Sequence, residues 1–222
     1  MHHISHPTWL NASVVKLALT QSLQGLAGVM FSMGLVFTNT QNNDAAGLAL
    51  TLLTRTLPTL ICAFIGGALA DRFSKKRISV IAAAISVVTY SGFAVLTWRY
   101  GLAWQVQLFS LLTAFISALG SPALYSLLPA VVEHDYLVQA NGFVRTLRNI
   151  AYVGAPVLVG LIAAHFSAQV LFAIASLSGI VTIILLTLVH VPKSFDDTKD
   201  EDQQQSLVDA LKTAPHLFKE YR

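Results

Sequence analysis

One charged residue of this sequence, Arg55, lies inside an apolar run and is a candidate for binding chemistry. The run extends from Ala46 to Ala70, and Arg55 lies about nine residues, or about 13 Å, from its first end. Keeping a charge at such a depth costs at least about 2.5 kcal/mol, so an arginine there is a candidate to bind a substrate or a coupling ion. Pro58, one turn later, could free backbone carbonyls for the same site.

Two polar stripes are the second candidate for binding chemistry. Residues three or four positions apart share one face of a helix, and this spacing joins polar residues within two apolar runs. One stripe consists of Gln21, Gln24 or Gly25, Gly28 and Ser32, and the other consists of Ser110, Thr113, Ser117, Ser121 and Tyr125. They could line a cavity for a neutral or amphipathic molecule, but serine, threonine and glycine also mediate helix packing in membranes. Both interpretations remain open, and the bulkier Gln21 and Gln24 favour the cavity.

Residue patterns that would support catalysis or metal binding do not occur. The sequence has no phosphate-binding loop, no His-Glu-x-x-His and no Gly-x-Ser-x-Gly. The lone Cys62 can form neither a disulfide framework nor a thiolate metal site. We therefore predict that the protein is not an enzyme and has no cofactor and no metal site.

The composition is that of a membrane protein. Of the 222 residues 55% are hydrophobic and 11% charged, and the mean hydropathy is +0.63. A bilayer core needs roughly 20 apolar residues per helix. Six such runs predict an all-α protein with six transmembrane helices and the lipid bilayer as its partner. The predicted spans are Val14–Phe37, Ala46–Ala70, Ile78–Trp98, Val106–Leu128, Ile150–Phe166 and Val170–Val191.

The distribution of lysine and arginine predicts the orientation, because loops on the cytoplasmic side are enriched in both. One side would hold Lys16, Arg72, Lys75, Lys76, Arg77, Arg145, Arg148, Lys193, Lys199, Lys212, Lys219 and Arg222, whereas the other would hold only Arg99. Both termini are therefore predicted to be cytoplasmic. The net charge of +3 reflects this bias and does not indicate a nucleic-acid partner.

These patterns divide the chain into three parts. Residues 1–13 form a cytoplasmic tail, residues 14–192 the six-helix transmembrane domain, and residues 193–222 a cytoplasmic linker. In the linker, Ser206 and Asp209 resemble a capping box that opens a short amphipathic helix.

The loop between the second and third spans carries four cations and one acid within the seven residues 71–77. A glycine followed by three residues, an Asp-Arg pair and a basic pair resembles the signature loop of the major facilitator superfamily. The alternative is an ordinary basic loop on the cytoplasmic side. The residues that carry the resemblance are Gly67, Asp71, Arg72, Lys75 and Lys76. The resemblance implies a latch in which Lys75 pairs with Glu133 or Asp135.

Two further segments extend this resemblance. Leu127-Leu128-Pro129, the segment 137–142 and Arg148-Asn149 are similar to the helix four to five region of macrolide and siderophore exporters. A weaker likeness links Gly154, Pro156 and Gly160 to a motif that antiporters carry in helix five. Packing or a kink is an equally good explanation for these three residues.

The resemblance implies a secondary active transporter in the cell membrane, an exporter of drug-like or other amphipathic small molecules. Family members bind their substrate between two six-helix halves. The sequence resembles the N-terminal half and ends before a seventh span, so the second half would belong to a longer chain or to another copy. The alternative is a six-helix membrane protein that does not transport and has a structural or regulatory role.

Overall fold

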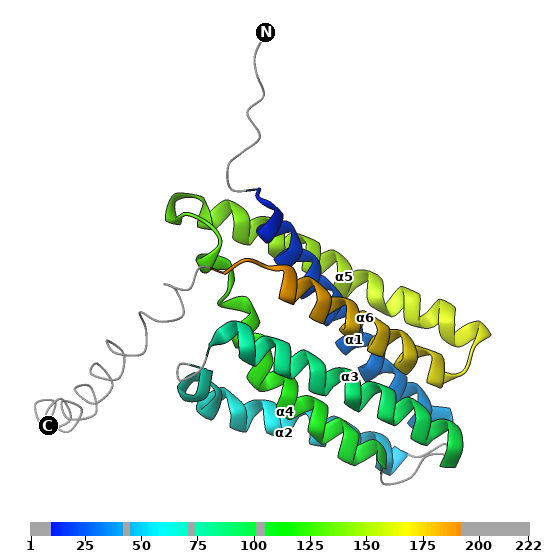
Figure 1. The fold of residues 1–222 in the computed structure, drawn as a ribbon. Helices are drawn as coiled ribbons and strands as arrows, with labels where there is room; N and C mark the ends of the chain where they lie inside the picture. The colour runs from blue at the N-terminus through cyan, green and yellow to red at the C-terminus, as the bar shows by residue number, and fades with distance from the viewer. Residues whose placement is uncertain (1–9, 42–44, 71–73, 101–104, 192–222) are drawn as a thin grey trace, which may run out of the picture.

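The computed structural model describes residues 10–41, 45–70, 74–100 and 105–191, with side chains in the second range only as far as Pro58. These residues form six long helices and no strand (Figure 1). The helices are α1 (Ala12–Gln41), α2 (Ala45–Ala70), α3 (Lys75–Tyr100), α4 (Gln105–Tyr125), α5 (Leu137–His165) and α6 (Ala168–Leu188). Two short 3-10 turns, Leu128–Ala130 and His134–Tyr136, join α4 to α5.

The predicted all-helical fold is confirmed, and each predicted span corresponds to one helix. Among the described residues five helices are long and apolar enough to cross a membrane. The largest difference is at α5, which begins at Leu137 rather than at Ile150. The apolar run marks only the part of a helix suited to lipid, whereas α5 continues through the more polar segment 139–149. At α4 the helix ends at Tyr125, and Leu128 belongs to the following turn.

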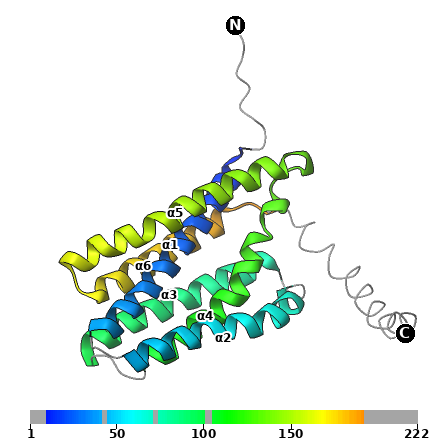
Figure 2. The same cartoon turned by 180° about the vertical axis from the view of Figure 1, so that it is seen from behind.

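The helices pack as two repeats of three. Helix α1 packs mainly against α5 and α6, α3 packs against α4 and α6, and α2 packs on α4 (Figures 1 and 2). The two groups α1–α3 and α4–α6 therefore have matching contacts. The packing of α1 on α5 corresponds to the packing of α4 on α2, and the packing of α1 on α6 corresponds to the packing of α4 on α3. Equivalent helices are three positions apart in the chain and successive helices alternate in direction, so α1 and α4 run in opposite directions. This is the arrangement of an inverted repeat.

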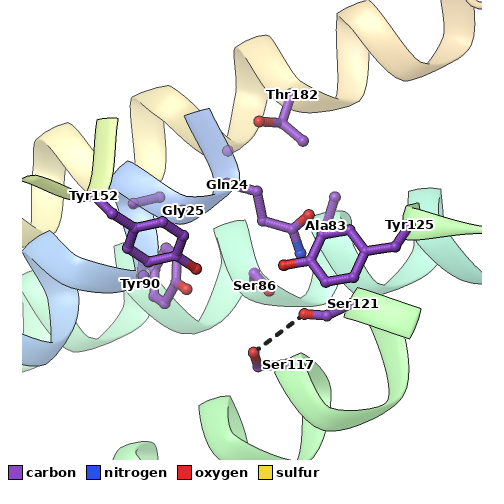
Figure 3. A pocket seen from close by; sticks show the side chains of 13 residues that line it. Gln24, Gly25, Ala83, Ser86, Tyr90, Ser117, Ser121, Tyr125, Tyr152 and Thr182 are labelled. Atoms are coloured by element: carbon purple, nitrogen blue, oxygen red, sulfur yellow. Dashed lines mark hydrogen bonds between the residues drawn. The ribbon is translucent and has the colours of Figure 1, made fainter. Parts of the chain in front are cut away.

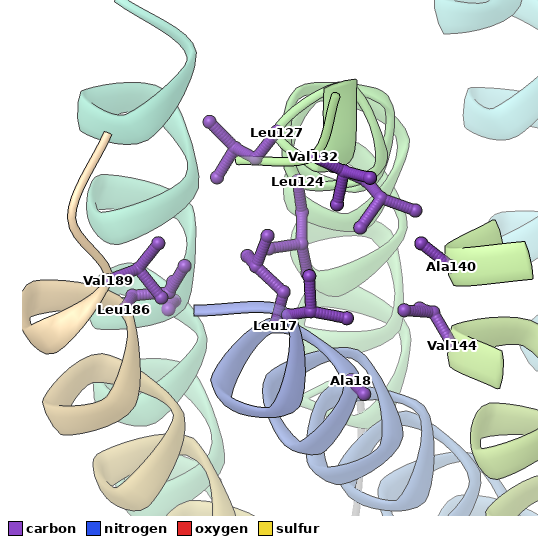
Figure 4. Close-up of a cluster of buried hydrophobic side chains, with 12 residues drawn as sticks. Leu17, Ala18, Leu124, Leu127, Val132, Ala140, Val144, Leu186 and Val189 are labelled. Carbon is purple, nitrogen blue, oxygen red and sulfur yellow. The ribbon is translucent and has the colours of Figure 1, made fainter. Parts of the chain in front are cut away.

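Two clusters of buried apolar side chains hold the repeats together. One lies near the start of α1 and contains Leu17, Leu124, Val144 and Leu186 (Figure 4). The other is aromatic and lies toward the end of α1. Its ring centroids are 5.3 Å apart for Phe31 and Phe172, and 4.7 Å apart for Phe93 and Phe172 in an edge-to-face arrangement. Such pairs add about 0.5–1.5 kcal/mol to the packing of the helices.

Two lysines from neighbouring helices bind the C-terminal end of α6. Lys16 Nζ donates to the carbonyl of Leu188 at 3.0 Å, and Lys76 Nζ donates to the carbonyl of Val189 at 2.6 Å. The last carbonyls of a helix lack partners within the helix and carry partial negative charge, so cations stabilise them. We call this end of the bundle, which carries Lys16, Lys75 and Lys76, the lysine end.

Asn11 fixes the start of α1 at the same end. Its Oδ1 accepts a hydrogen bond from the backbone N–H of Val14 at 2.9 Å, which caps the helix. Its Nδ2 donates to the carbonyl of Val131 at 2.9 Å, in the connection between α4 and α5. One side chain therefore joins two segments that are far apart in the sequence.

Helices α3 and α4 are in close contact at Gly120. A methyl group on Gly120 would lie 2.5 Å from the Cβ of Ala82, too close for two carbon atoms. Small residues commonly allow such approaches between membrane helices. The contact fixes the distance between the two helices that flank the centre of the bundle.

We expect Gly120→Ala to lower the free energy of unfolding by about 1–3 kcal/mol, because the added methyl group forces α3 and α4 apart. Unfolding by sodium dodecyl sulfate in detergent micelles, followed by circular dichroism, measures the change. Gly160→Ala is the control, since a methyl group there meets no atom within 4 Å. That variant should be neutral or stabilised by up to about 1 kcal/mol. Equal stability of the two variants would contradict the close contact.

Candidate binding cavity

A polar cavity of about 70 Å³ lies among five of the six helices (Figure 3). Its polar lining consists of Gln24, Ser86, Tyr90, Ser117, Ser121, Tyr125, Tyr152 and Thr182, with Gly25, Gly28 and Gly179 leaving space beside them. The hydroxyl groups of Ser117 and Ser121 are 3.5 Å apart. Thr182 is buried, and its hydroxyl has no hydrogen-bond partner among the described residues.

A second cavity, of about 100 Å³, adjoins the first. The two share Gly28, Tyr90 and Ser117, and the second also contacts Phe31, Thr113 and Arg55. Together they form a polar path along α1 and α4 through otherwise apolar helices. Neither cavity reaches the roughly 300–1,000 Å³ of a pocket that encloses a drug-sized molecule.

Arg55 reaches this path from α2. Its Nη1 donates a hydrogen bond to the hydroxyl of Ser32 on α1, and its side chain lines the second cavity. The residue that the sequence singled out as a buried charge therefore lies beside polar groups at the centre of the bundle. Its proposed role in binding remains a prediction.

Arg148 occupies a comparable position that the sequence analysis missed. Its guanidinium carbon lies 4.7 Å from the ring centroid of Tyr125, and its Nη1 donates to Oε1 of Gln21 at 3.4 Å. The sequence analysis placed Arg148 in a cytoplasmic segment because the apolar run begins only at Ile150. In the structure α5 starts at Leu137, so Arg148 lies three turns inside the helix. The signal available in the sequence was that Arg148 lies four residues before Tyr152, a spacing that places two side chains on one face of a helix.

Most of the predicted stripe lines the path. Gln24, Thr113, Ser117, Ser121 and Tyr125 all contact one of the two cavities. Ser110 and Gln21 are packed elsewhere. The hydroxyl of Ser110 is buried and donates to the carbonyl of Thr51 on α2 at 3.3 Å, and Gln21 is buried and accepts from Arg148. The lining residues that were not predicted are Ser86, Tyr90, Tyr152 and Thr182.

The residues of the basic loop are only partly placed. Gly67 lies on the part of α2 of which only the backbone is described, and Asp71 and Arg72 lie outside the described residues. Lys76 donates to the carbonyls of Thr187 and Val189 at the end of α6, and its predicted part in the gating loop stays a prediction. Glu133 and Asp135 are exposed in the turn between α4 and α5. The predicted latch between Lys75 and one of these acids stays a prediction.

The three residues of the helix-five motif lie away from the cavity lining. A methyl group on Gly154 or Gly160 would meet no atom within 4 Å, and Pro156 is exposed. They lie on the apolar part of α5, most of which is not buried by the other helices. Within the described residues, the motif therefore faces no neighbouring helix closely.

The chemistry that the cavity offers is noncovalent binding. Hydroxyl, amide and guanidinium groups can donate or accept hydrogen bonds, and aromatic rings provide apolar contact. Among the described residues no group of three or more histidine, cysteine or acidic side chains could hold a metal ion. A bundle of apolar helices around such a polar path is typical of a multi-pass membrane protein.

The chain belongs to the Major Facilitator Superfamily, whose sequence pattern matches residues 17–220. Members of this family are membrane transporters, which agrees with the predicted absence of enzyme activity. The resemblance of this chain to exporters, which the sequence predicted, is confirmed by the relatives that it matches.

Three of these relatives are efflux proteins. Macrolide efflux protein A of Streptococcus pyogenes is 25% identical over 188 residues, which cover 82% of this chain and 45% of that protein. The enterobactin exporter EntS of Salmonella choleraesuis is 27% identical over 85% of this chain and 45% of its own length. The multidrug efflux pump Tap of Mycobacterium tuberculosis is 29% identical over 56% of this chain and 31% of its own length. The chain thus spans less than half the length of these relatives.

The contact between Arg148 and Tyr125 can be tested with a double-mutant cycle. We expect a coupling free energy of about 0.5–2 kcal/mol between Tyr125→Leu and Arg148→Gln, because the ring face attracts the guanidinium group. The measurement is the free energy of unfolding in detergent micelles. Tyr125→Phe keeps the ring face and is the control, so its coupling to Arg148→Gln should be much smaller. Additive effects of Tyr125→Leu and Arg148→Gln would contradict the contact.

Proposed function

We propose that this chain is the N-terminal half of a secondary active exporter of amphipathic small molecules. The observation that carries the proposal is the polar path formed by two adjoining cavities inside a bundle of apolar helices. A molecule with both apolar and polar groups can place its polar groups on the hydroxyl and amide side chains and its apolar part against Phe31 and Tyr90. The export direction is inferred from the relatives, which are efflux proteins.

A second six-helix half would complete the site. The two cavities are each too small to enclose a drug-sized molecule, so a site for such a molecule needs a further wall. In transporters of this family the substrate site lies at the interface of two halves that rock against each other. We infer that the second wall comes from the remainder of a longer chain or from another copy of this one.

Expression in a bacterial strain that lacks its own efflux pumps tests the proposal. We expect lower accumulation of at least one of erythromycin, Nile red and carboxyfluorescein, and restored accumulation when an uncoupler removes the proton gradient. Ser117→Leu should reduce this efflux at least about tenfold, because Ser117 lines both cavities and the larger side chain would fill them.

Ser91→Leu is the matched control for the efflux experiment. Ser91 lies on α3, bonds back to the carbonyl of Val87 and lines neither cavity. Its variant should keep efflux at the level of the unchanged protein, at equal amounts of protein in the membrane. Accumulation unchanged by expression for every compound would contradict transport by copies of this chain alone. It would leave a second half on a longer chain, or the alternative of a six-helix protein that does not transport.

We further propose that the lysine end faces the cytoplasm, because cytoplasmic segments of membrane proteins are enriched in lysine and arginine. The test uses single cysteines in a Cys62→Ala background and a maleimide that does not cross membranes. Glu133→Cys, in the exposed turn at the lysine end, should be labelled only after cell lysis. Ser167→Cys, in the exposed turn at the opposite end, should be labelled in intact cells. The reverse pattern would contradict this orientation.

A further inference from the structure

Two ammonium groups meet at the C-terminal end of α6, at the lysine end of the bundle. Lys16 Nζ, from α1, donates to the carbonyl of Leu188. Lys76 Nζ, from α3, donates to the carbonyls of Thr187 and Val189. Because the three carbonyls belong to consecutive residues, the two ammonium groups lie within about one helix diameter, or about 10–12 Å, of each other. Helix α6 packs against both α1 and α3, so a lysine from each neighbour reaches its end.

Positive charge exceeds negative charge at this end of α6. The last carbonyls of a helix carry about half a negative elementary charge, which two ammonium groups outweigh. Hydrogen-bond donors remain as well, since an ammonium group has three N–H donors. Lys16 uses one of its donors and Lys76 two on described residues, and neither contacts an acidic side chain there. The two lysines can therefore bind an anionic oxygen in addition to the carbonyls.

The length of α6 places its end at the edge of the hydrocarbon core. The helix has 21 residues, which span about 31 Å at 1.5 Å per residue. A hydrocarbon core is about 30 Å thick. Helix α6 also has the highest mean hydropathy, 2.5, of the five candidate spans among the described residues. The two ammonium groups therefore lie at the level at which the hydrocarbon core gives way to the phosphates of the lipid head groups.

An exposed apolar face of α6 leads to these ammonium groups. Leu177, Val181, Ile184 and Leu188 are 38–61% exposed. Their spacing of three or four residues places them on one face of the helix. Other faces of α6 pack against α1 and α3, so this face points away from the bundle. A lipid acyl chain can lie along it while the head group of the same lipid reaches the lysines.

We propose that the lysine end binds the anionic head group of one phospholipid, with Lys16 and Lys76 on its phosphate and an acyl chain along the exposed face of α6. Basic pockets between membrane helices on the cytoplasmic side bind anionic head groups, and the lysine end is the end that we propose to be cytoplasmic. The partner is a lipid rather than a soluble phosphate, because the apolar face adjoins the two charges. The site requires neither a cargo nor a second half, so it is independent of the proposed transport function.

Native mass spectrometry of the full chain, released from detergent micelles, tests the site. Phosphatidylglycerol and phosphatidylcholine with identical acyl chains are titrated, and the fraction of the protein that retains one lipid gives the dissociation constant. We expect phosphatidylglycerol to bind at least about tenfold more tightly than phosphatidylcholine. Lys16→Gln and Lys76→Gln should each weaken phosphatidylglycerol binding about fivefold, the loss expected for one lysine beside an anionic lipid.

Arg99→Gln is the matched control, since Arg99 is an exposed cation on the same helix as Lys76 but at its opposite end. It should retain phosphatidylglycerol like the unchanged protein. Lys16→Arg and Lys76→Arg keep the charge and should lose less binding than the glutamine variants. If a glutamine variant does not fold, phosphatidylglycerol with a photoreactive diazirine in its head group is cross-linked to the unchanged protein. The label should lie at the end of α6 or at the starts of α1 and α3, and labelling only elsewhere would contradict the site.

Three results would overturn the proposal. The first is equal retention of phosphatidylglycerol and phosphatidylcholine by the unchanged protein. The second is an equal loss of binding in Lys16→Gln, Lys76→Gln and Arg99→Gln, which would indicate a general attraction of anionic lipids to cations. The third is displacement of phosphatidylglycerol by an excess of glycerophosphoglycerol, its water-soluble head group without acyl chains, which would indicate a site for a soluble phosphate.

Discussion

The fold depends on one constraint, which is that lipid offers no hydrogen bonds to polar groups. Every polar group of a membrane helix must find its partner within the protein. Hydroxyl side chains in this bundle meet the constraint by donating to the carbonyl four residues earlier, as Thr38 does at 2.6 Å and Thr97 at 2.9 Å. The helix ends meet it through Asn11, Lys16 and Lys76. The side chains that line the polar path can form hydrogen bonds in addition to these local ones, and a substrate or a water molecule would be their partner there.

The sequence predicted the helices well because length and apolarity are local properties. The start of α5 was missed because its first residues, from Leu137 to Asn149, are too polar to count as an apolar run while still forming a helix. That single difference concealed Arg148, since its depth follows from where the helix begins. The cavity was predicted from α1 and α4, whose stripes are long. The rest of the polar lining comes from isolated residues on three other helices, namely Ser86 on α3, Tyr152 on α5 and Thr182 on α6. Only tertiary packing brings these residues to the cavity.

The inverted repeat links the architecture to the proposed mechanism. Opposite orientation of two similar three-helix units gives a bundle whose two ends resemble each other around the membrane centre. Arg55, the eleventh residue of α2, and Arg148, the twelfth of α5, follow this relation, although their partners differ in chemistry: a serine hydroxyl holds Arg55, whereas an aromatic ring and an amide hold Arg148. Equivalent positions with unequal partners make the two repeats similar in fold but different in chemistry, and only Arg55 of the two arginines lines a cavity.

The packing of α1 also determines the order in which the bundle can assemble during synthesis. Its main neighbours are α5 and α6 rather than α2. About 96 residues separate the end of α1 from the start of α5, and at about 5–20 residues per second a ribosome needs about 5–19 seconds to make them. Throughout this interval the first helix has no native neighbour on most of its surface. The hydrogen bond from Asn11 Nδ2 to the carbonyl of Val131 has to wait as well, because Val131 follows α4. Of the six described helices, α1 is therefore among the last to gain its native neighbours, although it is the first of them to be made.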